Sequence, residues 1–215
     1  ALTIPAAPAP GVGRAMLGDL PLGERNRRLL AVRQSTFGGT LAALVTCEQC
    51  GARVEIAVPA STLDAPVSST ASSLTDGAAS RRTLRPLTSR DLAAAAQCEN
   101  AERARVFLAA LALSGGESHE LSPPDLTAAD LESIAQRLHE LDPLAVCLLD
   151  VRCSECGANW ECELDVPEFV WVEIEAEALR VLRDVHTLAS ACGWQEADIL
   201  AMSPLRRRAY LELVQ

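Results

Sequence analysis

Lysine is absent from the 215-residue sequence, and aromatic residues make up only 3% of it. The 19 basic residues are therefore all arginine, and 29 acidic residues leave a net charge of −10, which disfavours general binding to nucleic-acid phosphates. Because aromatic side chains are scarce, the core must be built from Leu, Ala and Val, which points mainly to helices. No apolar run reaches the ~20 residues that span a bilayer, so we expect no membrane insertion.

A charged-then-apolar leader is also missing, which predicts a soluble, unexported protein. This bears on the eight cysteines. In a long chain without a leader, cysteines in closely spaced pairs are more typical of a metal site than of a disulfide framework.

Two CxxCG motifs organise the sequence, CEQCG at 47–51 and CSECG at 153–157. Within each motif the two-residue spacer lets both sulfurs reach one ion, and the glycine accepts the backbone angles of the turn. Together the motifs supply four thiolates, the full ligand set of a tetrahedral structural zinc. We predict one shared Zn²⁺ site with the ligands Cys47, Cys50, Cys153 and Cys156.

The segments around the two motifs repeat one another. CEQCGARVEIAVP at 47–59 aligns with CSECGANWECELDVP at 153–167, and the second copy is two residues longer. A cysteine turn followed by a short alternating strand, present twice, predicts a split zinc ribbon of two knuckles with short antiparallel strands. Everything between the knuckles is then an insertion in the ribbon.

Alternatives to a structural metal are less well supported. A thioredoxin-type redox pair needs its second cysteine at a helix start, whereas glycine and a predicted strand follow both pairs here. Four thiolates also leave no open position for water, so we expect no enzyme activity and no catalytic residue. The other cysteines are predicted to be small core residues, with Cys162 as an alternative ligand: Cys98, Cys147, Cys162 and Cys192.

The fold class predicted is α+β and mainly helical, with a helical insertion and a long C-terminal helix followed by two short ones. The expected order is a flexible lead-in (1–20), a helix and first knuckle (21–58), a Ser/Thr-rich loop (59–80), a helical insertion (81–143), the second knuckle (144–167) and a C-terminal helical region (168–215). Helices are expected at about 22–37, 91–97, 101–113, 128–141, 168–192, 196–202 and 204–213. Strands are expected at 41–46, 53–58, 144–151 and 158–166, with a short edge strand at 81–85.

Apolar periodicity predicts which helix faces are buried. The first helix should direct Leu22, Leu29, Leu30 and Val32 inward and Arg25, Arg27, Arg28 and Arg33 outward. The long helix carries a near-heptad stripe: Trp171, Ile174, Ala178, Val181, Val185, Leu188 and Cys192. Trp171 and Trp194 are both expected in the core.

The three histidines and the arginine-rich C terminus complete the candidate sites. His119 and His139 are expected in solvent, and His186 is expected to pack or form hydrogen bonds beside the stripe. Because Arg206, Arg207 and Arg208 point in three directions on a helix, we favour a docking surface for a protein over a nucleic-acid groove. The candidate partner-binding residues are Trp194, Arg206, Arg207, Arg208 and Tyr210.

Three segments resemble the T-even-phage-type baseplate (hub assembly) protein family, which is found in contractile tails and extracellular contractile injection systems. They are DLPLGERNRRLLAVRQSTFG at 19–38, LRPLTSRDLAAA at 84–95 and the tail VLRDVHTLASACGWQEADILAMSPLRRRAYLELV at 181–214. The resemblance matches the four knuckle cysteines to the family's metal ligands. It matches His186, Gly193, Trp194, Arg207 and Tyr210 to the family's tail motif.

The resemblance implies a non-enzymatic assembly or structural protein that binds hub, spike or tube proteins through its long helix and C-terminal helices. It places the chain in the bacterial cytoplasm or incorporated in a phage-tail-like particle. The alternative is a zinc-ribbon adaptor that binds nucleic acid or transcription components, which would need a continuous basic face. A thiol-dependent enzyme is a third hypothesis, and it would need a reactive cysteine of low pKa.

Overall fold

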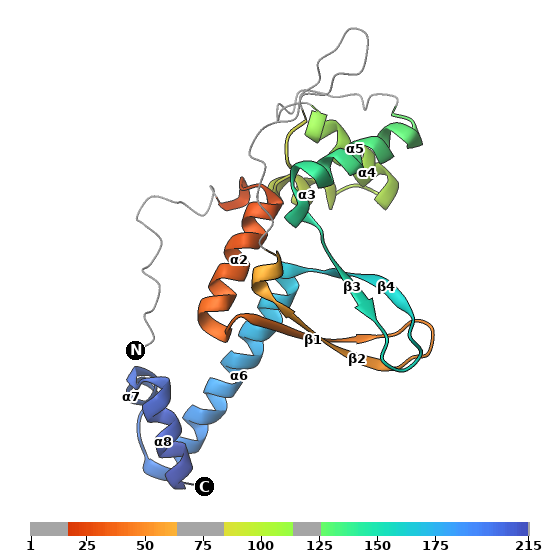
Figure 1. Ribbon diagram of the computed structural model, residues 1–215. Coiled ribbons are helices and arrows are strands. Elements are labelled where there is room, and N and C mark those ends of the chain that lie inside the picture. Colours follow the sequence, from red (N-terminus) through yellow and green to blue (C-terminus); the bar gives the residue numbers. More distant parts are fainter. Residues whose placement is uncertain (1–16, 64–83, 114–125, 215) are drawn as a thin grey trace. The chain divides into compact units, whose positions relative to one another are not determined.

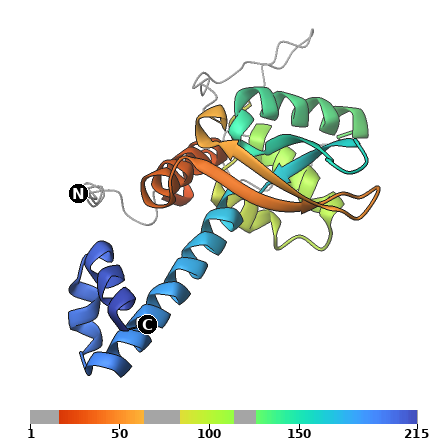
Figure 2. The same cartoon turned by 60° about the horizontal axis from the view of Figure 1, so that its bottom comes forward.

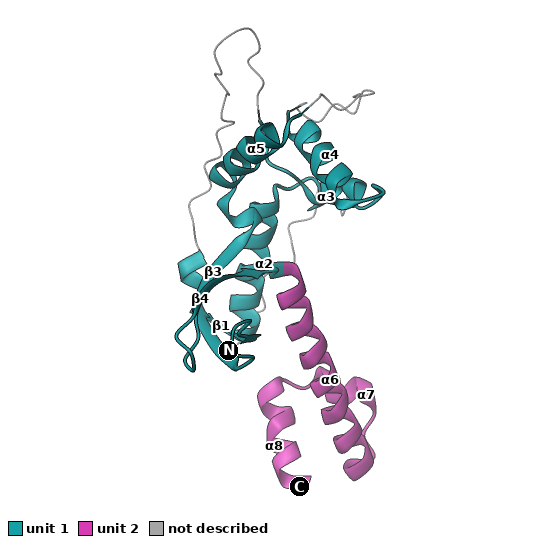
Figure 3. Cartoon of the chain, turned by 90° about the vertical axis from the view of Figure 1, so that its right-hand side faces the viewer, with its two compact units in different colours: residues 1–166 teal, residues 167–215 magenta. Residues whose placement is uncertain are grey.

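The computed structural model describes residues 17–63, 84–113 and 126–214 (Figure 1). Over these residues the chain is mainly helical with two small antiparallel sheets, as predicted. The chain divides into two compact units, residues 1–166 and 167–215 (Figure 3). The predicted lead-in up to residue 16, the Ser/Thr-rich loop from residue 64 and His119 lie outside the described residues.

Helix α2 spans Leu22–Phe37 and ends at Gly38, as expected. Its predicted faces were partly wrong, because Val32 is 53% exposed and Arg33 is buried. Arg33 tolerates burial since its guanidinium Nη1 donates to the Gly38 carbonyl oxygen at 2.6 Å. Asn26 is also buried, and its amide donates to the Leu144 carbonyl oxygen at 2.7 Å. Buried polar groups with hydrogen-bond partners thus replace part of the expected apolar face.

A carboxylate from far along the chain caps the start of α2. Pro21, the residue before the helix, makes no side-chain cap. Instead the Gly23 backbone N–H donates to Asp142 Oδ2 at 2.9 Å, and Asp142 is buried. The first N–H groups of a helix lack intrahelical acceptors and favour a negative charge, so Asp142 joins the two segments by a specific contact.

This contact predicts that Gly23→Ala destabilises the protein by about 2 kcal/mol or more, although alanine favours helices. A Cβ atom on Gly23 would lie 1.8 Å from Asp142 Oδ1 and would force the buried carboxylate to move. Urea denaturation measures the effect. Gly18→Ala is the matched control, because its Cβ would meet only the Arg90 side chain at 3.4 Å. Equal midpoints for the two variants would contradict the capping role.

Three helices form the insertion, α3 (Ser89–Ala95), α4 (Ala101–Leu113) and α5 (Ala128–Leu141). Thr88 and Thr127 begin α3 and α5 with capping boxes. The edge strand expected at 81–85 is wrong for its described part. Leu84 is instead buried in the helical core, and the Arg85 N–H donates to the Ala112 carbonyl oxygen. An apolar side chain that docks on helices gains more burial than an edge strand would provide.

Two β-hairpins form the rest of the first unit. Strand β1 (Thr40–Thr46) pairs antiparallel with β2 (Arg53–Pro59), and β3 (Cys147–Arg152) pairs antiparallel with β4 (Asn159–Leu164). Short 3₁₀ turns adjoin them, η1 at Ala60–Leu63 and η2 at Pro143–Ala145, so β3 begins three residues later than expected. The two cysteine motifs are the turns of these hairpins, and both turns lie close together in Figures 1 and 2.

The second unit contains most of α6 (Val166–Cys192) with α7 (Glu196–Ala201) and α8 (Pro204–Val214). Its core is Val185, Leu188 and Ile199. In Figure 3, α7 and α8 flank the C-terminal part of α6. Of the predicted stripe, only Val185 and Leu188 are buried. Trp171 and Ile174 are 57% and 41% exposed and Cys192 is exposed, so their predicted burial was wrong.

Candidate metal centre

The structure brings all four predicted cysteine ligands together. Their Sγ atoms lie within 4.8 Å of one another. Two distances join atoms of opposite motifs, Cys47 Sγ to Cys156 Sγ at 3.7 Å and Cys50 Sγ to Cys153 Sγ at 3.6 Å. A tetrahedral ion about 2.3 Å from each sulfur requires sulfurs about 3.8 Å apart, whereas a disulfide requires about 2.05 Å. The spacing fits a four-sulfur metal site.

Each motif folds into the same hydrogen-bonded knuckle. In the first, the Cys47 N–H donates to the Ala52 carbonyl oxygen at 2.8 Å, and the Gly51 N–H donates to the Cys47 carbonyl oxygen at 2.9 Å. The second knuckle repeats both bonds between corresponding residues, at 2.8 and 3.0 Å. Gly51 and Gly157 have φ angles of 71° and 74°, a region that favours glycine. The repeat seen in the sequence is thus a repeat of structure.

Side chains behind the knuckles join the two hairpins. Cys47 and Cys153 are each 1% exposed, whereas Cys50 and Cys156 are exposed. The buried cysteines form one apolar cluster with Val54 and Val151. Partly buried residues of both hairpins pack around this cluster: Val45, Ala52, Ile56, Leu149, Ala158, Trp160 and Cys162. The shared cluster holds the two pairs of sulfurs in reach of each other.

Three of the four thiols have shifted pKa values. Backbone hydrogen bonds from Cys156 and then Glu155 lower the pKa of Cys153 to about 7. The Ala52 backbone lowers the pKa of Cys50, but the neighbouring thiols, Cys156 first, together with desolvation outweigh it and raise the pKa to about 12. The pKa of Cys156 is also raised, although the Ala158 backbone and the Cys50 thiol act against the rise. A bound cation would allow all four sulfurs to ionise together.

This arrangement could hold a metal ion. Four cysteine sulfurs suit thiophilic metals in tetrahedral geometry, such as zinc or iron. Because all four positions are taken by protein, a metal bound here has no vacant position for water, and its effect is to hold the hairpins together.

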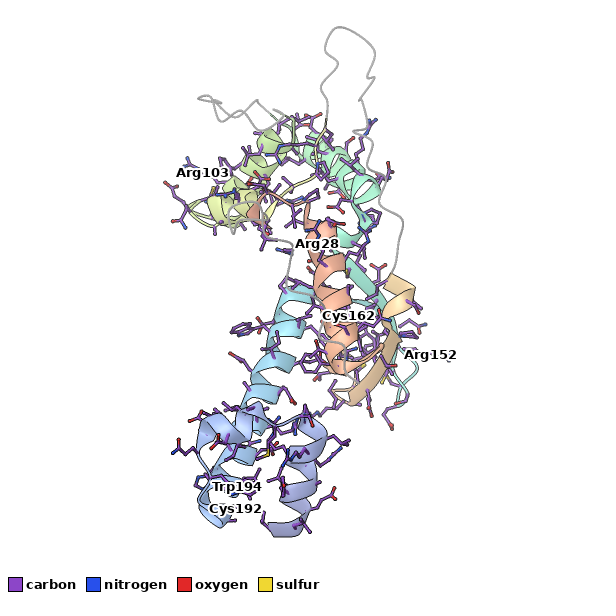
Figure 4. All side chains as sticks on the ribbon, turned by 90° about the vertical axis from the view of Figure 1, so that its left-hand side faces the viewer. Arg28, Arg103, Arg152, Cys162, Cys192 and Trp194 are labelled. Atoms are coloured by element: carbon purple, nitrogen blue, oxygen red, sulfur yellow. The ribbon has the colours of Figure 1, made fainter. Side chains whose placement is uncertain are left out.

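The four other cysteines do not belong to the group of clustered sulfurs. Cys147 is buried, as predicted, and burial raises its pKa. Cys98 is half-buried. Cys162, labelled in Figure 4, packs behind the knuckles, and its thiol donates to the Glu163 carbonyl oxygen at 3.7 Å. Within the described residues it is not one of the clustered sulfurs, so the alternative of Cys162 as a ligand finds no support.

The predicted partner-binding residues all belong to the second unit. The rings of Trp194 and Tyr210 pack edge to face, 4.9 Å apart at 81°, and the Arg206 guanidinium lies 5.6 Å from the Tyr210 ring centre. Arg206 and Arg208 are exposed. Arg207 is 6% exposed, with its Nε 3.6 Å from Asp184 Oδ2, so it contributes to the fold of the unit and not to an open surface.

Neither of the two histidines that the structure describes belongs to the metal centre. His139 is exposed, as predicted. His186 is also exposed, so the expectation that it packs beside the stripe was wrong. Sequence periodicity placed it next to buried Val185, but α7 and α8 cover the neighbouring face of the helix.

Comparisons with protein-family models, curated proteins and solved structures found no match to this chain. Among the helices that the structure describes, none combines the length and the apolar character needed to cross a membrane.

Proposed function

We propose that the four cysteines bind one structural zinc ion and that the two hairpins form a split zinc ribbon. The observation that carries this proposal is the approach of four sulfurs from two distant motifs to distances of 3.6 and 3.7 Å. The zinc would supply the charge that lets four crowded thiols ionise. It would hold together strands that are separated in the chain by the whole helical insertion.

We also propose a non-enzymatic role for this zinc-stabilised protein in the assembly or structure of a contractile injection system or phage-tail baseplate, where it binds hub, spike or tube proteins. The support comes from the three sequence segments that resemble the baseplate family and from a four-sulfur site without room for a substrate. The tail segment of that resemblance forms the core of the second unit, including Trp194, Tyr210 and buried Arg207.

The partner surface that we propose is the outer face of α8. Leu205 and Leu213 are 81% and 80% exposed there, and Arg206 and Arg208 are exposed beside them. Arginine is enriched among residues that contribute strongly to protein–protein binding, and exposed leucines beside it offer apolar area that a partner would bury. An acidic groove on a tube, hub or spike protein would match this face.

Arg208→Glu is expected to weaken binding to purified hub, spike or tube protein by about tenfold or more, because it reverses one charge at the centre of the proposed surface. Isothermal titration calorimetry measures the effect. Arg103→Glu is the matched control, since Arg103 is an exposed arginine on α4 in the other unit.

Equal loss in both variants would indicate a general charge effect and contradict the α8 surface. Absence of the protein from both particles and assembly intermediates would contradict the baseplate role itself. Salt-sensitive binding to DNA or RNA would instead favour the zinc-ribbon adaptor.

A further inference from the structure

The four sulfurs of the metal centre include two close pairs, and each pair joins one hairpin to the other. Cys47 Sγ lies 3.7 Å from Cys156 Sγ, and Cys50 Sγ lies 3.6 Å from Cys153 Sγ. Each pair combines a buried cysteine, Cys47 or Cys153, with an exposed one, Cys156 or Cys50. The sulfurs of a pair need to approach by only about 1.6 Å to reach the disulfide bond length of about 2.05 Å.

The folded chain sets which sulfurs meet. The Cys153 sulfur accepts hydrogen bonds from two backbone N–H groups of its own knuckle. The sulfurs of Cys50 and Cys156 accept hydrogen bonds from the N–H groups of Ala52 and Ala158, which hold corresponding positions in the two knuckles. The apolar cluster behind the knuckles holds the hairpins that carry these sulfurs. Both close pairs are therefore part of the fold.

We propose that peroxides oxidise this centre to two disulfides, one between Cys47 and Cys156 and one between Cys50 and Cys153, which replace the metal as the join between the hairpins. The release of zinc rests on the proposed zinc site, whereas the pairing of the sulfurs does not. Four cysteines allow three pairings. Pairing Cys47 with Cys153 would create a pair with no exposed sulfur for peroxide to reach, and pairing within each motif would leave both close approaches unused.

One peroxide oxidises each pair. The exposed thiolate attacks one oxygen of hydrogen peroxide, the O–O bond breaks, and the sulfur becomes a sulfenic acid while hydroxide leaves and takes up a proton to form water. The buried thiolate of the same pair then attacks that sulfur, the S–O bond breaks, and the leaving hydroxide takes up a second proton. Two thiolates thus lose two electrons, and one peroxide is reduced to two waters. Disulfide sulfurs carry no negative charge and no longer bind a zinc ion.

The hairpins then stay joined in both reducing and oxidising surroundings. In the reduced chain the four thiolates share a cation, and in the oxidised chain two covalent bonds link cysteines that are 109 and 103 positions apart. Disulfides that close long loops restrict the unfolded chain strongly. The oxidised, metal-free protein should therefore melt at a higher temperature than the reduced, metal-free protein.

The pairing can be mapped with proteases, because a glutamate separates the two cysteines of each motif, Glu48 in the first and Glu155 in the second. The full-length, zinc-loaded protein is treated with hydrogen peroxide, its remaining thiols are alkylated, and it is digested without reduction by trypsin and a glutamate-specific protease. Mass spectrometry is expected to find two joined products: peptide 34–48 with 156–161, and peptide 49–53 with 153–155.

A colorimetric indicator is expected to record about one zinc released for every two peroxides consumed. Cys162→Ser is the matched control, because Cys162 packs behind the knuckles, and its peptide map and zinc release should be unchanged. Cys50→Ser should lose the product of 49–53 with 153–155 and keep the other. If Cys50→Ser does not fold, the map of the unmodified protein decides.

Peptides joined within a motif, such as 34–48 with 49–53, would overturn the proposal. So would four thiols that stay free after peroxide treatment, or thiols oxidised to sulfinic acids in place of disulfides. A purified protein without zinc would contradict the proposed zinc site, and the peptide map of that metal-free protein would still support or overturn the pairing.

Discussion

Replacing Cys153 with serine is expected to remove the metal and unfold the paired hairpins. Cys153 is buried behind the knuckle and has the most acidic of the shifted thiols, so it is the ligand best prepared to bind a cation. Structural zinc contributes on the order of 10 kcal/mol in small modules. If about 5 kcal/mol of this is lost from a chain of this size, the melting temperature falls by ~10–20 °C.

The measurement pairs metal analysis with a thermal melt. We expect one zinc per chain in the unmodified protein and less than a tenth of that in Cys153→Ser. Cys98→Ser is the matched control, because Cys98 is half-buried and lies in the helical insertion. A Cys153→Ser protein with full metal content and an unchanged melt would show that this sulfur is not a ligand.

Acid is expected to release the metal steeply, with affinity falling about 100-fold per pH unit between pH 8 and 7. In the metal-free protein the pKa values of Cys50 and Cys156 are raised, to about 12 for Cys50, so both thiols carry protons throughout this range. Binding must then displace at least two protons. Because bound thiolates titrate far below these pKa values, the stabilisation is present at high pH and is lost as pH falls.

Below pH 7 the dependence should steepen by up to about a further tenfold per unit, since Cys153, with a pKa of about 7, becomes an additional protonated ligand. Competition titration with a chromophoric chelator across pH 6–8 measures both slopes. An ion pair between Arg85 and Asp91 in the helical insertion serves as an internal control. Arg85 holds the pKa of Asp91 below its usual value, so this ion pair persists from pH 8 to pH 6. If the metal affinity fell only about tenfold or less per pH unit, binding would displace one proton or fewer, and the thiols would already be ionised without metal.

Local signals in the sequence predicted most of the fold. The bounds of α2, α4 and α5 matched because glycine, proline and capping threonines mark them directly. The candidate metal ligands could also be predicted from the sequence, since a CxxCG motif fixes the turn that carries the two sulfurs. Finding the motif twice, with matching strands, indicated that the two halves form one site.

The sequence could not predict which polar residues are buried or which apolar ones are exposed. Arg33 and Asp142 are buried, and each is hydrogen-bonded to backbone, Arg33 at the end of its own helix and Asp142 Oδ2 at the start of a helix far away in the chain. Trp171 fits a buried heptad position but is exposed, because α7 and α8 are too short to cover the whole of α6. Both errors arise from tertiary contacts, which helix periodicity does not encode.

X-ray absorption spectroscopy at the zinc edge, combined with metal quantitation on the purified protein, tests most directly whether sulfurs from both knuckles hold one ion. A metal shared by both knuckles gives a single zinc per chain with four sulfur neighbours at about 2.3 Å. Two zinc ions per chain, or a single zinc with two sulfurs and two nitrogen or oxygen neighbours, would show that the knuckles do not share a metal.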